Sequence, residues 1–312
     1  MSRIYEALRQ KEHEPSNRPT PDQGAELADA AEPASVKSEL KLVEEMLRAV
    51  ESEPDGEQPL SDSFATFEVP PNKPASKPVL APNGFPTLQL PAKKDSPLVF
   101  HNDACSLAAE QFRFLSRVLQ QKFPAGGAVM MTSPAPKDGK TFTTVNLASC
   151  LADAGHAVLV LEADIRQPMV HNMLGGGTNT AAGVEEVLAG AVEPSESVNF
   201  VEELSLHVAM VARPPADPAR LISGSGPKRF LAWARKHFAW VVIDAPPVLP
   251  VSDVTQLVPL ADAVLLVVRA RKTPRQLVTR SFELLGEHLS GVVLNEATVD
   301  SNPYYRYIAE YR

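Results

Sequence analysis

The sequence predicts an α/β fold, in which a mostly parallel sheet is flanked by helices on both faces and follows a largely disordered N-terminal segment. Two observations favour this fold. Beyond residue 97, short apolar runs rich in β-branched residues alternate with segments whose apolar residues recur at helical spacing. Before residue 97, proline is frequent and charged and small residues dominate, which is typical of a chain that forms no packed core.

The expected strands are short runs of apolar residues. A parallel strand covered by helices is buried on both faces, so its sequence is nearly continuously apolar rather than alternating. Such runs indicate strands at 128–133, 157–164, 204–212, 240–246, 263–270 and 290–297. Sheets of this kind bind ligands at the carboxyl ends of their strands. Polar residues that follow these runs are therefore the candidates for function.

The expected helices lie between the strands, with one more before the first strand. Helical spacing predicts them at 105–122, 141–154, 183–189, 227–238, 253–260 and 274–288. Two of them run up to a glycine, Gly155 and Gly190, which is a common way for a helix to end.

The predicted domain division is a low-complexity region at 1–96, a folded domain at 97–300 and a tail at 301–312. Fourteen of the 29 prolines lie in residues 1–97. Short helical patterns occur near 2–11 and 35–50. For 35–50 we favour a transient helix in a linker over a docking helix, and for 2–11 both interpretations stay open.

Bulk properties exclude some classes of function. The net charge of −8 disfavours nucleic acid as the main partner. The sequence has no apolar run of about 18 residues and begins with no signal-like stretch, so we expect a cytoplasmic protein. Cys105 and Cys150 form no CxxC pair and are expected to be reduced thiols.

A candidate phosphate loop, SPAPKDGKT, follows the first strand. Its GKT opens a helix directly after a buried strand, where backbone N–H groups and the helix N-terminus converge on an anion. This context predicts a P-loop NTPase fold, although the glycine that the general pattern wants five positions before Gly139 is Pro134 here. Lys140 is expected to neutralise the β- and γ-phosphates of ATP, and the Thr141 hydroxyl to reach Mg²⁺. The predicted nucleotide-binding residues of the loop are Pro136, Lys137, Asp138, Gly139, Lys140, Thr141 and Phe142.

Three carboxylates end two later strands. In VLVLEADIRQP, Glu162 and Asp164 are two residues apart, so both side chains are expected on one face. In WVVIDAPPV, Asp244 ends another buried run. An aspartate at a strand end often merely caps the next helix. Three such carboxylates downstream of a GKT instead favour a Mg²⁺ site formed by Thr141, Asp164 and Asp244, directly or through water.

With these motifs the chain resembles the bacterial tyrosine kinases (BY-kinases) of exopolysaccharide and capsule synthesis, specifically the cytoplasmic CpsD/CapB-type autokinases. The resemblance covers about residues 97–312. SPAPKDGKT is similar to the family's SxxPxxGK[ST] loop, LVLEADIR to its three apolar residues followed by DxDxR, and VVIDAPP to its three apolar residues followed by DxPP. The ending PYYRYIAEY is similar to the family's tyrosine cluster.

The resemblance implies catalytic roles for Lys140, Glu162, Asp164 and Asp244. Glu162 stands where the family has aspartate, and it would help to deprotonate the incoming tyrosine. Arg166 would orient the carboxylates or contact phosphate, and a salt bridge to Asp164 is an equally good expectation.

The resemblance also implies oligomer formation through the helix before the first strand. The family has an ExxRxxR assembly motif there, and EQFRFLS is similar to it. Glu110 and Arg113 fit the motif as oligomerisation residues, whereas Ser116 departs from it.

The C-terminal tyrosines are the expected phosphoacceptors. Four of the five tyrosines, Tyr304, Tyr305, Tyr307 and Tyr311, lie in the last nine residues. A flexible end can reach the γ-phosphate on a neighbouring subunit, whereas a tyrosine in a core cannot. Together with this cluster, the resemblance implies an ATP-dependent protein-tyrosine autokinase that acts on the cluster in neighbouring subunits and regulates exopolysaccharide or capsule synthesis and export. Tyrosine–arginine alternation also suits a docking segment.

The expected partners follow from the same resemblance. They are a membrane-anchored chain-length regulator of the Wzz type as activator, a tyrosine phosphatase and further copies of this chain. One alternative function is a ParA/MinD-like nucleotide-switch ATPase without tyrosine phosphotransfer, but its early loop lysine is absent because Ala135 occupies that position. A second alternative is a pseudokinase adaptor, which Glu162 alone supports.

Overall fold

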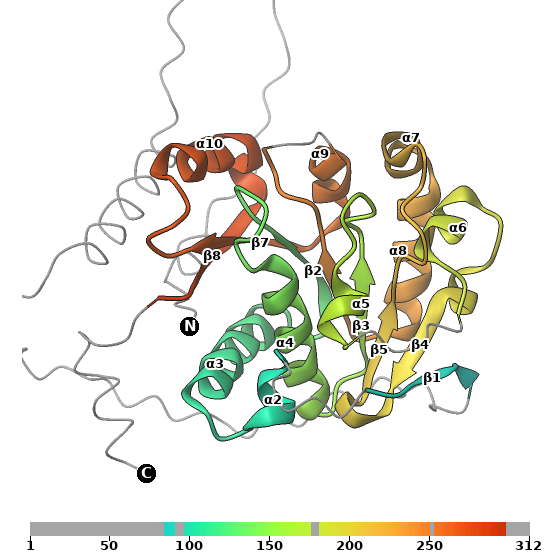
Figure 1. Ribbon diagram of the computed structural model, residues 1–312, viewed down its shortest axis with the longest axis horizontal. Coiled ribbons are helices and arrows are strands. Elements are labelled where there is room, and N and C mark those ends of the chain that lie inside the picture. Colours follow the sequence, from blue (N-terminus) through green and yellow to red (C-terminus); the bar gives the residue numbers. More distant parts are fainter. Residues whose placement is uncertain (1–83, 91–96, 176–180, 250–252, 298–312) are drawn as a thin grey trace, which may run out of the picture.

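The computed structural model describes residues 84–90, 97–175, 181–249 and 253–297, which are coloured in Figure 1. The helices expected near 2–11 and 35–50 lie outside these residues. So do the four tyrosines of the C-terminal cluster, so their predicted role stays a prediction.

An eight-stranded sheet forms the centre of the described part of the chain (Figure 1). Its strands are β1 (Thr87–Leu88), β2 (Gly127–Thr132), β3 (Val158–Glu162), β4 (Val198–Val201), β5 (Leu206–Ala209), β6 (Trp240–Asp244), β7 (Ala263–Arg269) and β8 (Leu289–Asn295). They lie in the order β1-β4-β5-β3-β6-β2-β7-β8. The strands from β5 to β8 in this order are parallel, while β4 is antiparallel to β5 and β1 is parallel to β4. The prediction of a mostly parallel sheet is confirmed.

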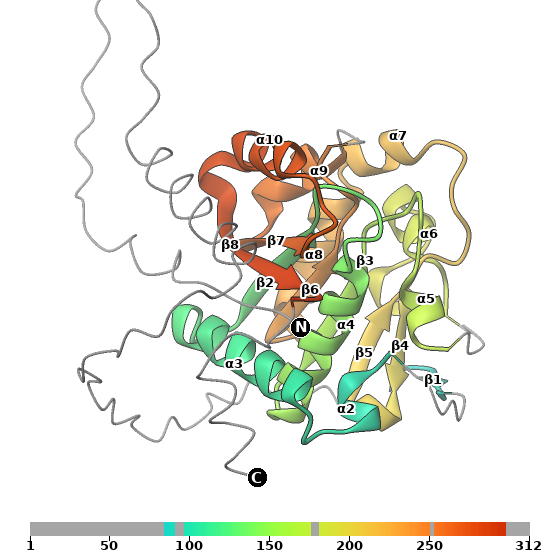
Figure 2. The same cartoon turned by 60° about the vertical axis from the view of Figure 1, so that its left-hand side comes forward.

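Helices cover both faces of the sheet, as Figure 2 shows from a second direction. One face carries α2 (Val99–Asn102), α3 (Leu107–Lys122), α4 (Lys140–Asp153) and α5 (Val170–Met173). The other carries α6 (Val184–Ala189), α7 (Pro218–Ser223), α8 (Gly226–His237), α9 (Asp253–Leu257) and α10 (Arg275–Leu285). Short 3₁₀ turns are η3 (Pro194–Ser197), η4 (Glu202–Leu204), η5 (Val258–Leu260) and η6 (Gly286–His288).

Each face of the sheet has its own apolar core. On the side of α3, Phe112, Leu115 and Leu119 recur every three or four residues, so one stripe of the helix is buried. On the opposite side, Phe230 and Leu231 of α8 pack in a second buried cluster with residues of β3 and β6. The site at the strand ends is therefore carried by a sheet that is held from both faces.

The structure adds elements that the sequence did not predict. The six expected strands and six expected helices are present with small shifts at their ends, but β1, β4, α2, α5 and α7 were missed. The missed strands have two and four residues, too few to show a pattern. β1 also lies within 1–96, so part of the region expected to be disordered is a strand of the sheet.

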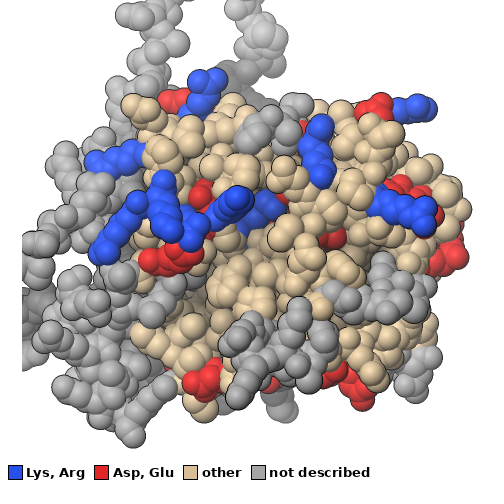
Figure 3. Space-filling model, viewed as in Figure 1, with Lys and Arg blue, Asp and Glu red and all other residues tan. Residues whose placement is uncertain are grey.

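The surface near α10 is rich in positive charge. Figure 3 shows Lys and Arg side chains gathered over this part of the molecule. Lys137 of the phosphate loop and Arg271, Lys272 and Arg275 around the start of α10 are exposed. A positive field of this kind raises the local concentration of anionic ligands. In the described part of the chain, none of the helices combines the length and apolar character that spanning a bilayer requires.

Candidate active site

The loop that connects β2 to α4 shapes the candidate site at the carboxyl edge of the sheet. Gly139 ends this loop with φ +97°, and a Cβ there would lie 2.0 Å from Asn295 Nδ2, so only glycine fits. The Thr143 N–H donates the first bond of α4, to the Gly139 carbonyl oxygen, at 2.9 Å. The amides just before Thr143 are the unpaired helix-start donors that bind anions such as phosphate.

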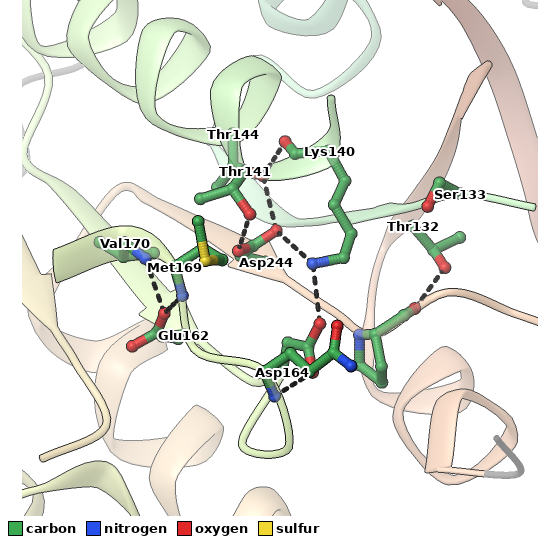
Figure 4. Close-up of polar contacts among 12 residues, drawn as sticks. Thr132, Ser133, Lys140, Thr141, Thr144, Glu162, Asp164, Met169, Val170 and Asp244 are labelled. Atoms are coloured by element: carbon green, nitrogen blue, oxygen red, sulfur yellow. Dashed lines mark hydrogen bonds and ion pairs between the residues drawn. The ribbon is translucent and has the colours of Figure 1, made fainter. Parts of the chain in front are cut away.

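Lys140 lies between two buried carboxylates (Figure 4). Its Nζ is 2.8 Å from Asp164 Oδ2 and 3.8 Å from Asp244 Oδ1. Burial is the largest single influence on the pKa of Lys140 and lowers it, but Asp244 and Asp164 together outweigh burial, so the pKa is raised. The lysine therefore stays charged and is held at the head of α4.

Asp244 is fixed by α4 and in turn fixes Asp164. The Thr141 hydroxyl donates to Asp244 Oδ2 at 2.7 Å, and the Thr144 hydroxyl lies 3.5 Å from Oδ1. The Asp244 carbonyl oxygen accepts bonds from the amides of Ala163 and Asp164, at 2.8 and 2.9 Å. Burial raises the pKa of Asp244, against the opposing effects of the Lys140 charge and the Thr141 hydrogen bond. The ends of β3 and β6 thus meet at α4.

The donor set of this cluster fits a magnesium ion bound together with a nucleotide. One ammonium faces two carboxylates, so the buried cluster carries an excess of negative charge. Among the described residues, no group of three or more His, Cys, Asp or Glu side chains could hold a metal ion. Mg²⁺ does not need such a group, because it usually takes one or two carboxylates and completes its shell with water and phosphate oxygens. Thr141, Asp164 and Asp244 offer that set.

Glu162 does not point toward the cluster, so the expectation that it shares a face with Asp164 is wrong. β3 ends at Glu162, and the alternation of a strand does not continue to Asp164. Glu162 Oε1 accepts hydrogen bonds from the amides of Met169 and Val170 at 2.6 and 2.7 Å (Figure 4). Its Oε2 accepts one from the Val211 amide at 2.9 Å.

The surroundings of Glu162 conflict with its predicted role as base. The side chain is 0% exposed. Burial raises its pKa to about 7, although its three backbone donors act in the opposite direction. A general base has to come within hydrogen-bonding distance of the proton that it removes. This carboxylate instead holds three backbone amides from two segments.

Arg166 forms its ion pair with a residue that the sequence did not indicate. It forms a two-pronged ion pair with Asp253 of α9, with Nε 2.7 Å from Oδ2 and Nη2 3.0 Å from Oδ1. Asp253 is buried, while Arg166 is exposed. The expected salt bridge between Arg166 and Asp164 is therefore replaced by a tie between the β3–α5 segment and α9. Whether Arg166 meets a nucleotide stays a prediction.

The remaining loop residues differ in what they offer a nucleotide. Pro136 and Lys137 are exposed at the tip of the loop. The Asp138 carboxylate is buried, and it accepts bonds from the Ala135 amide (3.1 Å) and the Thr273 hydroxyl (2.7 Å). Burial raises the pKa of Asp138, against these two bonds. The Phe142 ring packs toward α3, 6.0 Å from the Phe112 ring, so only its backbone lies at the loop.

The residues expected to form oligomers lie on α3, away from the phosphate loop in sequence. Glu110 Oε1 pairs with Arg113 Nη1 at 2.6 Å, and Arg113 also lies over the Phe100 ring at 5.5 Å. Ser116, which departs from the motif, is buried, while Arg117 is exposed. Oligomerisation through Glu110 and Arg113 stays a prediction.

Sequence reasoning missed four residues that hold the site. They are Thr144, Asp253, Thr273 and Asn295. Asn295 carried a signal, because it is a polar residue at the end of an apolar run, as Asp244 is. Asp253 opens a predicted helix, where an aspartate is common. Thr273 had no signal, since it lies in an ordinary turn before α10.

The fold and the phosphate loop define a class, the P-loop nucleotide-binding proteins. Residues 129–311 match the family described as the CobQ/CobB/MinD/ParA nucleotide binding domain. That match covers more than half of the chain.

Several relatives narrow the class. Tyrosine-protein kinase YwqD of Bacillus subtilis is 31% identical over 212 residues, which cover 65% of this chain and 86% of that protein. Tyrosine-protein kinase ptk of Acinetobacter johnsonii is 28% identical over 220 residues, which cover 69% of this chain but only 30% of that longer protein. The solved kinase domain of the Escherichia coli tyrosine kinase ETK has a TM-score of 0.60 and 25% identity, covering 70% of this chain and 94% of that one. The chain belongs to the bacterial tyrosine kinase family.

Proposed function

We propose that the protein is an ATP-dependent protein-tyrosine autokinase that phosphorylates the C-terminal tyrosine cluster of neighbouring subunits and thereby regulates exopolysaccharide or capsule synthesis and export. One observation carries the proposal. Lys140, Asp164 and Asp244 form a buried charged cluster at the N-terminus of α4, beside a loop with donors for phosphate. Membership of the tyrosine kinase family supports the same conclusion.

The chain's residues bind and orient the nucleotide. The amides of Lys137 to Thr141 receive the phosphates of ATP, with the N-terminus of the 14-residue α4 behind them. Lys140 neutralises charge on the β- and γ-phosphates. Its present contacts with Asp164 and Asp244 keep it charged and in place at the edge of the loop.

Magnesium is the proposed cofactor, held by Thr141, Asp164 and Asp244 directly or through water. When bound it supplies positive charge that neutralises the phosphate oxygens during transfer. Asp244 accepts a hydrogen bond from Thr141 and is the most enclosed of these groups, at 0% exposure. Its position fixes the other two.

The transfer itself requires positioning more than a strong base. The tyrosine oxygen forms a bond to the γ-phosphorus as the bond to the bridging oxygen of ADP breaks. In a loose transition state the phenol loses its proton late, to an oxygen of the transferred phosphoryl group or to water, so its pKa near 10 does not prevent the transfer. We therefore assign catalysis to Lys140, Asp164 and Asp244, and assign Glu162 to the backbone around them.

The same proposal includes partners and a location. A membrane-anchored activator of the Wzz type would recruit the kinase to the inner face of the membrane, and a tyrosine phosphatase would reverse its reaction. Assembly of several copies through Glu110 and Arg113 would bring the tail of one subunit to the site of the next. These assignments rest on the family resemblance.

A second candidate function is a nucleotide-switch ATPase of the ParA/MinD type. The family-level match favours it, because the CobQ/CobB/MinD/ParA domain is shared. Such a protein would hydrolyse ATP without forming phosphotyrosine. A pseudokinase adaptor would do neither, and the enclosed Glu162 is compatible with it.

One experiment separates these functions. Purified protein is incubated with ATP and Mg²⁺, with and without the cytosolic tail of a co-expressed Wzz-type partner, and modified residues are mapped by mass spectrometry. Phosphate on Tyr304, Tyr305, Tyr307 or Tyr311 supports the kinase, and Lys140→Met should reduce its rate by roughly a hundredfold or more, because an interaction specific to the transition state is lost. ATP hydrolysis without labelled tyrosine would overturn the proposal.

A further inference from the structure

We propose that Thr273 and Asn295 are positioning residues that clamp the phosphate loop in its nucleotide-binding shape before any ligand arrives. The inference rests on the proposed function only in assuming that this loop binds a nucleotide. The clamp is defined as Arg269 at the end of β7, Thr273 four residues later and Asn295 at the end of β8, acting on Lys137 and Asp138 of the loop. The clamp is made from parts of the chain that lie far from the loop in sequence.

The loop needs an external support because its backbone is in an unfavourable conformation. Lys137 has φ +69° although it is not glycine, and Gly139 has φ +97°. A residue with a side chain adopts this left-handed conformation only at an energetic cost. Such residues persist when their surroundings over-determine them. Residues 137–139 therefore need contacts with other parts of the chain to keep this conformation.

Asp138 is the point where the loop meets the end of β7. Its buried carboxylate accepts a bond from the Ala135 amide at 3.1 Å, which closes the loop on itself. It also accepts a bond from the Thr273 hydroxyl at 2.7 Å. That hydroxyl in turn accepts a bond from the Arg269 amide at 3.0 Å. A donor role toward Asp138 and an acceptor role toward Arg269 fix the hydroxyl in one orientation.

Asn295 closes the loop from the neighbouring strand. Its Nδ2 donates to the Asp138 carbonyl oxygen at 3.1 Å and lies where a Cβ at Gly139 would be. Asn295 is buried, and its own carbonyl oxygen accepts a bond from the Ala270 amide at 2.8 Å. The backbone of Asn295 is therefore fixed by its bond to Ala270, while its side chain bonds to the phosphate loop.

Arg269 completes the clamp at the outer side. Its guanidinium pairs with Glu296 through two bonds of 2.7 Å and lies 3.5 Å from the Lys137 carbonyl oxygen. Glu296 directly follows Asn295, so this ion pair joins the ends of β7 and β8, and both ends contact the loop.

The clamp bonds have little to do with sheet stability. β7 and β8 already pair along six residue positions, from Val264 with Leu289 to Arg269 with Asn295. The Thr273 hydroxyl, beyond the end of β7, and the Asn295 side chain both bond to Asp138 and add nothing to that ladder. A loop that is already ordered loses less conformational entropy when a ligand binds. Losing these bonds should therefore weaken nucleotide binding more than it lowers the stability of the fold.

The test compares two substitutions of Thr273 in the full chain. Thr273→Val keeps the shape and removes the hydroxyl, while Thr273→Ser keeps the hydroxyl. Calorimetry with ADP should show about tenfold weaker binding for Thr273→Val, the effect of losing a hydrogen bond to a charged group, and wild-type affinity for Thr273→Ser. In turnover assays the KM for ATP should rise while kcat stays unchanged, because the lost binding is uniform.

Ser281→Ala is the matched control. Its hydroxyl donates to the Leu277 carbonyl oxygen at 2.8 Å within α10, so the change removes a hydroxyl hydrogen bond from the helix that follows Thr273 without touching the loop. Its ADP affinity should equal that of the wild type. Asn295→Ala is the second clamp variant and should weaken ADP binding like Thr273→Val.

Amide hydrogen exchange in the nucleotide-free protein measures directly how firmly the clamp holds the loop. The amides of Ala135 and of residues 137–139 should exchange faster in Thr273→Val than in Ser281→Ala. Unchanged ADP affinity and unchanged exchange in Thr273→Val and Asn295→Ala would overturn the clamp.

Tyrosine labelling is a separate readout, since a wild type that binds ADP but labels no tyrosine would refute the kinase function and leave the clamp proposal intact. A wild type that binds no nucleotide would refute both.

Discussion

Glu162 is a motif residue whose carboxylate holds the backbone. It accepts hydrogen bonds from the amides of Met169 and Val170, where α5 begins, and from the amide of Val211 after β5. The segment between Glu162 and Met169 contains Asp164. By tying down the end of this segment, Glu162 supports a residue that contacts Lys140 without contacting it itself.

Glu162→Gln is therefore expected to affect stability rather than chemistry. An amide nitrogen in place of one oxygen would face a backbone N–H and leave it unpaired, which costs about 1–3 kcal/mol in a buried site. Urea unfolding at pH 8 should show that loss of unfolding free energy. The rate of tyrosine phosphorylation per folded molecule, at saturating ATP, should stay within about twofold of the wild type, since removing a general base would instead cost about 10²–10⁴.

Asp164→Asn is the comparison for this prediction. Asp164 contacts Lys140 directly, so its phosphorylation rate should collapse where that of Glu162→Gln does not. A rate for Glu162→Gln as low as that of Asp164→Asn would restore Glu162 as the base.

Strand β5 shows how an element gains a pH dependence from one buried side chain. His207 is 2% exposed and surrounded by the rings of Phe85, Phe200 and Phe238, with centroids 5.4, 4.9 and 5.1 Å away. Within the described part of the chain, neither ring nitrogen makes a hydrogen bond of good geometry. Burial lowers the pKa of His207 to about 4, against a weaker opposing contact with the Val158 backbone. The imidazole is therefore neutral in the folded protein at neutral pH.

Acidification should destabilise this protein through His207. Below about pH 6.5 the unfolded chain binds a proton at this histidine, while the folded chain does so only near pH 4. Stability is thus fully present above pH 6.5 and is lost as the pH falls toward 4, by up to about 3 kcal/mol. Urea unfolding at pH 7.5, 5.5 and 4.5 should show this loss in the wild type, and His207→Leu should abolish that share of it.

A surface histidine provides the control for the pH experiment. His288 lies exposed in η6, and His288→Gln should keep the pH dependence of the wild type. If His207→Leu lost as much stability on acidification as His288→Gln, the buried imidazole would not be its source.

Across the whole molecule, sequence analysis predicted the features that are marked by contiguous stretches of residues. Short apolar runs predicted the six parallel strands, the GKT motif predicted Lys140, and the carboxylates that follow two of the runs predicted Asp164 and Asp244. Contacts between residues that lie far apart in the chain could not be predicted from such stretches. Asp138 and Thr273 are 135 positions apart, and nothing local marks Thr273 as a partner. The direction of Glu162 was also hidden, because it depends on β3 ending at that residue.

The boundary of the folded domain is a second point where local composition misled. Residues 84–90 lie in the proline-rich region, yet β1 pairs with β4 and extends the sheet. The Phe200 amide donates to the Pro86 carbonyl oxygen at 2.8 Å, and Leu88 is 1% exposed. A two-residue strand has no periodicity to detect, so its pairing depends on an edge that only the folded sheet supplies.

Two truncated chains test this boundary. A chain starting at residue 97, the predicted boundary, loses β1, the buried Leu88 and the Phe85 ring beside His207, and it exposes the edge of β4. Loss of a buried leucine alone costs about 2–5 kcal/mol, and for a domain of this size each kcal/mol lowers Tm by about 2–4 °C. Calorimetry should therefore give a Tm roughly 5–15 °C below that of a chain starting at residue 84. Equal melting temperatures would mean that β1 adds nothing, and would return the boundary to residue 97.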